Sequence, residues 1–383
     1  MRKSGKYTAT SLMALALVGA AGTGSVGLAP AAAAAAVTTP TAAAGYCQVA
    51  TPPQWTRAMQ SGRLPGVAGL HSQTLAVSAD GLTRFVVLSD ATSQRLVEMH
   101  GKSTAYRVIA RYPSGWQSGT GFGMAGFDGR HLAYLVNTDS SDTTWKIYSY
   151  DTRGTAAPRL IGAQQDLEVP AGPFVVPQVS AGLATWVQPL RDGTRQVHAY
   201  DLAAHRDRVV TTAHVYRSVF AGDLLVWQVS PAPDAPTVLR AVDVRTWAPV
   251  RLPAPLAAVR DAWEVVSDGT RWFWLSSDFS GISAWQPGWA RPVTVLAGGA
   301  GVQGLGLAGR LLSYTDDTAT YLVDLSSHSR TRATPRWGLS EVNGTRMEIG
   351  YLATDSKTAP LVEYEVNSAA LPRLPHCPAP SAP

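Results

Sequence analysis

Short apolar runs separated by turn residues fill the chain from residue 74 to residue 367. In the clearest stretch, residues 126–162, the dipeptide Asp128-Gly129 precedes the runs HLAYLVN, WKIYSYD and RLIG. Asp-Gly accepts the positive φ angle of a tight hairpin turn, and alternation of apolar and polar positions buries one face of each strand. The stretch therefore predicts a turn followed by three short antiparallel strands.

This unit occurs seven times along the chain, and every copy has a glycine-containing turn. An apolar run before each turn, such as GFGMAGF, predicts an inner strand, so each unit predicts four strands. One such sheet cannot bury both of its faces, so the units must stack around an axis. Their spacing of 38 to 51 residues fits one propeller blade per unit. The expected fold is an all-β, seven-bladed β-propeller, with six or eight blades as alternatives. The third strands are expected to end near Met99, Tyr150, Tyr200, Val242, Trp285, Val323 and Tyr364.

The segment GFDGRHLAYLVN…IYSYDTRGTAAPRLI resembles the repeat of TolB-like propellers, in which Pro-Asp-Gly or a similar turn precedes three strands. The similarity is strongest over residues 122–163, fair over residues 74–113, and elsewhere a matter of periodicity. Phe127 or Ala79 stands where the family has proline, and most of the later units lack Asp-Gly. WD-repeat propellers share the architecture but fit these motifs less well. The resemblance implies a secreted propeller and assigns no catalytic residue.

The first residues have the three-part pattern of a secretory signal peptide. Arg2, Lys3 and Lys6 precede the apolar run SLMALALVGAA and a stretch of small residues, so we expect a leader over residues 1–36. The apolar run is shorter than the roughly 20 residues that span a bilayer. Without these three basic residues the formal charge of +5 becomes 5 − 3 = +2, too small to indicate a nucleic-acid partner. The expected protein is secreted, extracellular or cell-wall associated, monomeric, and without an integral membrane segment.

The two cysteines, Cys47 and Cys377, stand near opposite ends of the chain. In an exported protein this placement predicts one disulfide that joins the two ends of the ring, with two unpaired thiols as the alternative. The spacing gives no CxxC motif, which disfavours thiol redox chemistry.

Residues 37–66, ahead of the first unit, are expected to form an N-terminal extension with a short helix over residues 51–62. Thr51 can cap this helix, two prolines suit its first turn, and Gly62 can end it. The propeller is then expected over residues 67–377. A disordered tail is expected over residues 378–383.

One face of the predicted ring carries the turns between first and second strands, and we call it the turn face. Arginines at the starts of second strands and acids at the ends of third strands are cross-strand neighbours there. We expect them to form exposed structural ion pairs worth at most about 1 kcal/mol each. The expected pairs are Arg130–Asp151, Arg310–Asp324 and Arg346–Glu365.

The opposite face, the loop face, has an acid in the loop between the second and third strands of every unit. A ring of carboxylates could bind Ca²⁺, an amine or a basic partner, although aspartate is also an ordinary turn former. Aromatic side chains beside acids would suit a sugar, whereas tryptophans such as Trp186, Trp227, Trp272 and Trp274 are expected as wedges between blades. The residues expected to bind a ligand on the loop face are Asp142, Asp192, Asp278, Asp316, Trp116, Trp263 and Trp337.

The sequence has no nucleophile elbow, P-loop, HExxH motif or His cluster with metal-ligand spacing. It therefore favours a non-catalytic extracellular binding or scaffold protein that recognises a protein or a polysaccharide on one propeller face. The alternative is a secreted glycoside hydrolase or polysaccharide lyase that uses two of the loop-face acids, and a structural domain without a small ligand is a third reading. No cofactor is expected, and Ca²⁺ is the metal that the acids would suit.

Overall fold

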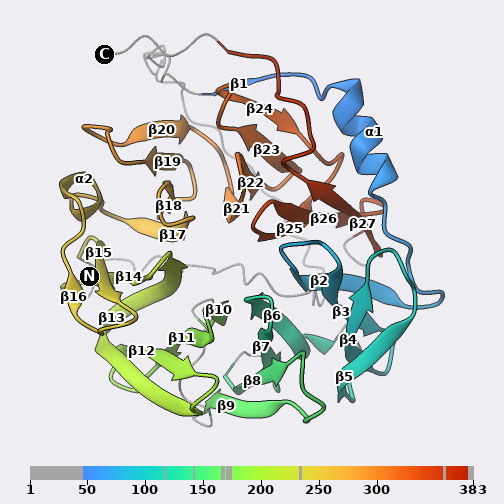
Figure 1. The fold of residues 1–383 in the computed structure, drawn as a ribbon, viewed down its shortest axis with the longest axis horizontal. Helices are drawn as coiled ribbons and strands as arrows, with labels where there is room; N and C mark the ends of the chain where they lie inside the picture. The colour runs from blue at the N-terminus through green and yellow to red at the C-terminus, as the bar shows by residue number, and fades with distance from the viewer. Residues whose placement is uncertain are drawn as a thin grey trace, which may run out of the picture.

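The strands form successive antiparallel groups that follow one another around a central axis (Figure 1). The computed structural model describes residues 46–115, 118–140, 143–164, 169, 175–232, 235–356 and 359–377. The expected leader, residues 1–36, and the expected tail, residues 378–383, lie outside the described residues. No helix in the described part of the chain is long and apolar enough to cross a membrane.

The first two units are four-stranded sheets, and each has its strands in chain order from the inside to the outside of the ring. The first contains β2 (His71–Val77), β3 (Thr83–Ser89), β4 (Gln94–His100) and β5 (Tyr106–Tyr112). The second contains β6 (Gly121–Phe127), β7 (His131–Asn137), β8 (Trp145–Asp151) and β9 (Arg159–Gln164).

The third and fourth units share one long strand, β13 (Arg206–Ala221), whose halves pair with β12 and with β14. The third unit also has β10 (Gln178–Ser180), β11 (Leu183–Pro189) and β12 (Arg195–Asp201). The fourth also has β14 (Leu224–Ser230), β15 (Val238–Asp243) and β16 (Pro249–Val250).

The last three units complete the ring. The fifth has β17 (Ala262–Ser267), β18 (Trp272–Ser276), β19 (Ile282–Trp285) and β20 (Val293–Leu296). The sixth has β21 (Gln303–Ala308), β22 (Leu311–Thr315), β23 (Thr320–Asp324) and β24 (Ser329–Arg332). The seventh has β25 (Gly338–Asn343), β26 (Arg346–Leu352) and β27 (Leu361–Asn367).

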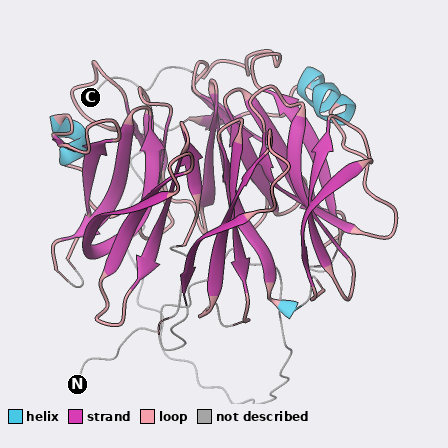
Figure 2. Ribbon diagram, turned by 60° about the horizontal axis from the view of Figure 1, so that its bottom comes forward, coloured by secondary structure: helices cyan, strands magenta, loops and turns pink. Residues whose placement is uncertain are grey.

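The inner strands contact one another in a closed circle, from β2 through β6, β10, β13, β17, β21 and β25 back to β2. Figure 1 shows the first and last units side by side, and Figure 2 shows the strands running between two loop-bearing faces. The prediction of an all-β propeller is confirmed, and the strand groups fit seven blades.

Apolar side chains from neighbouring blades pack between the sheets. Trp186 of the third blade is 1% exposed and packs against Trp145 and Ile147 of the second. Trp227, Trp272 and Trp274 are also buried, so the wedge prediction is confirmed. Trp145, at the loop-face end of β8, is fully buried because it lies in this interblade core.

The N-terminal segment completes the last two blades from outside. β1 (Cys47–Gln48) pairs in parallel with β24, while Arg63 forms an isolated bridge to Tyr364 on the outer edge of β27. The Leu64 amide donates a hydrogen bond to the Glu363 carbonyl at 2.9 Å. The disulfide between Cys47 and Cys377 is present, with its Cα atoms 6.0 Å apart. Both ends of the chain are thereby fixed to the same sector of the ring.

The expected short helix is present as α1 (Pro53–Ser61), at the outside of the ring, with Gly62 at its C-cap. Thr51 does not cap it: the residue at the N-cap is Pro52, and the Thr51 hydroxyl instead donates to the Arg332 carbonyl at 2.9 Å. A second, one-turn helix, α2 (Ala254–Ala257), was not predicted. It is part of the connection between the fourth and fifth blades, and its Leu256 is buried in the core there.

The three expected turn-face ion pairs are present, at 2.7 Å for Arg130–Asp151, 3.4 Å for Arg310–Asp324 and 2.8 Å for Arg346–Glu365. The expectation that all are exposed is wrong for Asp324. Its carboxylate is fully buried and also accepts a hydrogen bond from the Leu374 amide, because the C-terminal segment covers it.

Candidate functional site

The loop-face acids are held by their own turns. Asp192 accepts hydrogen bonds from the amide and hydroxyl of Thr194 at 2.9 and 2.6 Å, and Asp278 accepts from the Ser276 hydroxyl at 2.5 Å. Asp316 accepts from the amides of its own turn. These hydrogen bonds lower the pKa of Asp192 and of Asp278. The acids therefore act as turn formers in this structure.

The other predicted ligand residues are distributed differently. Asp142 and Trp116 lie outside the described residues. Trp337 is half-buried just before β25, and its carbonyl accepts a hydrogen bond from the Leu352 amide at 3.3 Å. Across the described ranges, no three His, Cys, Asp or Glu side chains are grouped so as to hold a metal ion. Binding of Ca²⁺ stays a prediction.

Trp263 is a predicted ligand residue that lies near two other aromatic rings and an arginine. It stands at the loop-face end of β17, where its ring lies 5.3 Å from that of Phe279, the residue after Asp278. The Tyr216 ring is 6.4 Å away, and the Arg217 guanidinium lies 5.5 Å from the Trp263 ring centre. We call Trp263, Tyr216, Phe279 and Arg217 the aromatic rim. It joins the fourth and fifth blades beside the axis of the ring.

Arg217, one member of the aromatic rim, lines a cavity at the axis of the ring. The cavity has a volume of about 350 Å³ and is lined by residues from all seven inner strands. Its wall combines apolar side chains, such as Leu75, Val265 and Leu305, with polar ones such as Gln178 and Gln228. A space of this size can hold a small ligand or a side chain of a partner.

Three charged side chains line this cavity: Arg217 on β13, Glu264 on β17 and Glu341 on β25. Arg217 and Glu264 form an ion pair, with 3.7 Å between Nη1 and Oε1, and both side chains are largely buried. Glu341 has no hydrogen-bond or ion-pair partner within the part of the chain that the structure describes. Burial, and secondly the nearby charge of Glu264, raise the pKa of Glu341 to about 8.

The cavity reaches the turn-face ends of the inner strands, where Val77, Phe127 and Asn343 line it and neighbouring blades are linked. The Asn343 side-chain amide donates to the carbonyls of Val77 and Phe127, at 3.0 and 3.2 Å, and so links the seventh blade to the first two. The Gly309 amide donates to the Gly344 carbonyl at 2.9 Å. At the loop-face end of β17, the aromatic rim meets the cavity through Arg217, the member of the rim that lines it.

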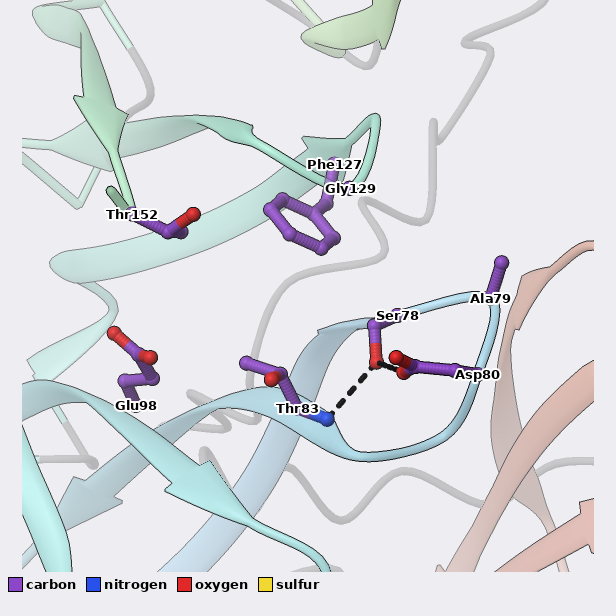
Figure 3. Close-up of a pocket in the computed structure, with 8 residues that line it drawn as sticks. All are labelled: Ser78, Ala79, Asp80, Thr83, Glu98, Phe127, Gly129 and Thr152. Carbon is purple, nitrogen blue, oxygen red and sulfur yellow. Dashed lines mark hydrogen bonds between the residues drawn. The ribbon is translucent and has the colours of Figure 1, made fainter.

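A second hollow, of about 330 Å³, lies on the turn face between the first and second blades (Figure 3). The Ser78 hydroxyl there donates to Asp80 at 2.5 Å and accepts from the Thr83 amide at 2.9 Å. Glu98 in the same hollow is ion-paired with Arg107. Its polar groups are thus engaged within the protein, and the axial cavity is the better candidate site.

The reading of the sequence missed Arg217, Glu264 and Glu341. The available signal was a charged residue inside each of three otherwise apolar inner runs, VYRSVFAGD, AWEVVSDG and LSEVNG. Inner strands of a propeller line its axis, so a charge within them faces either the channel or a blade interface. The loop-face acids form a more regular pattern in the sequence, because each repeat has one.

No protein-family model matches the chain, and no curated protein matches it. A solved prolyl endopeptidase has a TM-score of 0.55 at 15% identity, with 85% of this chain and 50% of that chain covered. The present chain therefore spans about half the length of that enzyme. The propeller domain of the Trilobed protease from Pyrococcus furiosus has a TM-score of 0.53 at 10% identity, with 78% and 96% covered.

The chain is a β-propeller. An oligogalacturonate lyase from Vibrio parahaemolyticus is also similar, with a TM-score of 0.52 at 10% identity and coverage of 79% and 92%. TolB from Acinetobacter baumannii is among the similar structures as well, with a TM-score of 0.42 at 13% identity and coverage of 73% and 78%. The similarity to the propeller domain of the Trilobed protease confirms the expected propeller fold. At these identities the likeness extends to the fold alone.

Proposed function

We propose that the protein is an extracellular, non-catalytic binding protein, a seven-bladed propeller that takes its ligand into the axial cavity past the aromatic rim. One observation carries this proposal: the axial cavity contains the carboxyl of Glu341, for which the described residues offer no partner. A carboxyl that lacks a partner inside the protein can be paired by a bound ligand of complementary charge. The partner is a protein or a polysaccharide that presents one group to the cavity.

Two further features support the proposal. The Cys47–Cys377 disulfide is compatible with an oxidising, extracellular compartment. The rings of Trp263, Tyr216 and Phe279 offer flat apolar faces to a sugar or an aromatic side chain at the cavity entrance.

The alternative is a glycoside hydrolase or polysaccharide lyase that uses Glu341 and Glu264 in place of the loop-face aspartates. A carboxyl with a raised pKa beside a second carboxylate is the arrangement that acid–base catalysis uses. Arg217, however, forms an ion pair with Glu264, so this carboxylate is already engaged within the protein, which favours binding over turnover.

A binding screen with a matched pair of variants tests the proposal. The disulfide-bonded chain is applied to glycan and peptide arrays, and the same glycans are assayed for release of reducing or unsaturated ends. For the ligands found, Trp263→Ala should weaken binding about tenfold, about 1.4 kcal/mol, because one ring face is lost from the entrance. Trp337→Ala, also a half-buried tryptophan, should leave binding within about twofold because it is not in the rim.

Turnover of a glycan that Glu341→Gln abolishes would replace the proposal with the enzymatic alternative. Equal losses of affinity in the two tryptophan variants would show that the aromatic rim is not part of the binding site.

A further inference from the structure

We infer that the axial cavity binds an organic ammonium group, such as the end of a lysine side chain or a free amine, with Glu341 as its counter-ion. This inference rests on the proposed function and names the chemistry of the group that enters the cavity.

The charges that line the cavity are unbalanced. One arginine faces two carboxyls, and Arg217 is already paired with Glu264 at 3.7 Å and lies against the Trp263 ring. Glu341 is left over, deep inside the ring on β25. The complementary ligand therefore carries one positive charge.

The wall of the cavity limits the rest of the ligand. The cavity that contains Glu341 is lined by polar side chains and by apolar ones such as Val342, Leu305 and Val219. A cation with an alkyl stem can bury that stem while its charged end meets the carboxylate. A bare Ca²⁺ ion fits poorly because it requires six to eight oxygen ligands, and the cavity has one uncommitted carboxyl.

Protonation of Glu341 gives the inference a measurable signature. Burial and the charge of Glu264 raise its pKa to about 8, so below that pH the empty cavity holds mostly the neutral acid. An ammonium ion favours the carboxylate, so binding at lower pH must release a proton. Between about pH 6.5 and pH 8.5, the ionised fraction and hence the affinity should rise about 25-fold.

Other charged groups near β25 are held elsewhere. Glu348 stands opposite Glu341 in the register of β25 and β26, but its carboxyl accepts a hydrogen bond from the Thr74 hydroxyl. The pH profile of amine binding is therefore assigned to Glu341, with Glu264 and Arg217 as the charges that share its cavity. The strands packed against β25 also carry His71, Asp324 and Arg346, at strand ends.

Isothermal titration of the full disulfide-bonded chain with n-pentylamine tests the inference, with 1-pentanol as the neutral control of equal length. We expect binding of the amine and none of the alcohol, the stated rise with pH, and release of nearly one proton at about pH 6.5, measured in two buffers of different ionisation enthalpy. Glu341→Gln, which keeps the side-chain shape, should lose amine binding at least tenfold. Asp192→Asn, which removes a loop-face carboxylate, should bind the amine like the unaltered protein.

Several results would overturn the inference: no binding of the amine, equal binding of amine and alcohol, or unchanged binding by Glu341→Gln. Thermal melting checks that the variant is folded. If Glu341→Gln does not fold, Glu341→Asp replaces it in the titration. Glu341→Asp should bind n-pentylamine more weakly than the unaltered protein, with the same rise in affinity with pH. The arrays could yield a partner whose binding weakens in Trp263→Ala while the protein does not bind n-pentylamine. That result would contradict this inference and leave the proposed function standing.

Discussion

At the residue scale, the least expected feature is a group of buried charges where the ring closes. We call this contact between β2–β3 and β26–β27 the seam. Glu348, 2% exposed, accepts a hydrogen bond from the Thr74 hydroxyl and lies 3.8 Å from Arg84. The neighbouring Glu363 accepts from the Thr74 amide at 2.7 Å. Arg84 stands at the start of a second strand, like the turn-face arginines, but the seam buries it because the first and last blades pack together there.

Burial, and secondly the charge of Glu363, raise the pKa of Glu348 well above its usual range. An acid with a raised folded-state pKa binds its proton more tightly in the folded state. Its contribution to stability is therefore complete at pH values below its unfolded pKa and is lost as pH rises through the folded value.

The variant Glu348→Gln should accordingly gain stability over the unaltered protein as pH rises. The amide cannot ionise, so at about pH 9 the difference should be on the order of 1 kcal/mol, and it should shrink toward about pH 5. Urea denaturation at both pH values measures it. Asp355→Asn, at a side chain that is 91% exposed, is the control and should show no such trend. A Glu348→Gln variant that loses more stability at high pH than at low pH would show that the carboxylate is the stabilising form.

At the scale of elements, the N-terminal segment acts as the outer edge of the last blade. Gly62 ends α1 and lies directly against β27, where an added Cβ would stand 2.0 Å from the Glu365 carbonyl oxygen. The contact is between backbones, so neither side can move away without breaking the hydrogen bond from the Glu365 amide to the Gly62 carbonyl.

Gly62→Ala should therefore lower the free energy of unfolding by about 1–3 kcal/mol, because the clash forces this edge off the blade. Gly66→Ala is the matched control: no atom lies within 4 Å of its added Cβ, so stability should stay within about 0.5 kcal/mol. Chemical denaturation of the two variants gives the comparison. Indistinguishable midpoints would mean that the helix end is not held against β27 in solution.

At the scale of the whole molecule, ring closure has both covalent and non-covalent parts. The inner strands β25 and β2 touch, the segment around Arg63 and Leu64 pairs with β27, and Cys47 is bonded to Cys377 across a sequence separation of 330 residues. The strand contacts hold the native ring, whereas the disulfide limits the unfolded chain.

Replacing both cysteines by serine should lower the free energy of unfolding by about 2–5 kcal/mol and leave the native circular-dichroism spectrum unchanged. The unaltered protein under reducing conditions should reproduce the midpoint of the variant. Peptide mapping without reductant should recover the fragment that links Cys47 to Cys377. An unchanged midpoint would show that strand contacts alone account for closure.

The sequence by itself determined the elements and their repetition. Alternating runs and glycine turns are local signals, so strands such as β7 and β8 and the turn at Asp128 follow from neighbouring residues alone. The disulfide followed from there being two cysteines in a chain with a leader-like start. The sequence also indicated that the loop-face acids form turns, because an aspartate side chain accepts hydrogen bonds from nearby backbone amides.

Only the tertiary structure decided which charges share a space. Arg217, Glu264 and Glu341 belong to three blades, and no spacing along the chain indicates that their side chains meet at the axis. Arg84 and Glu348 are likewise brought together only when the last blade packs against the first. The reason is physical: alternation fixes which face of a strand is buried, but what lies opposite that face is set by the number of blades and the closure of the ring.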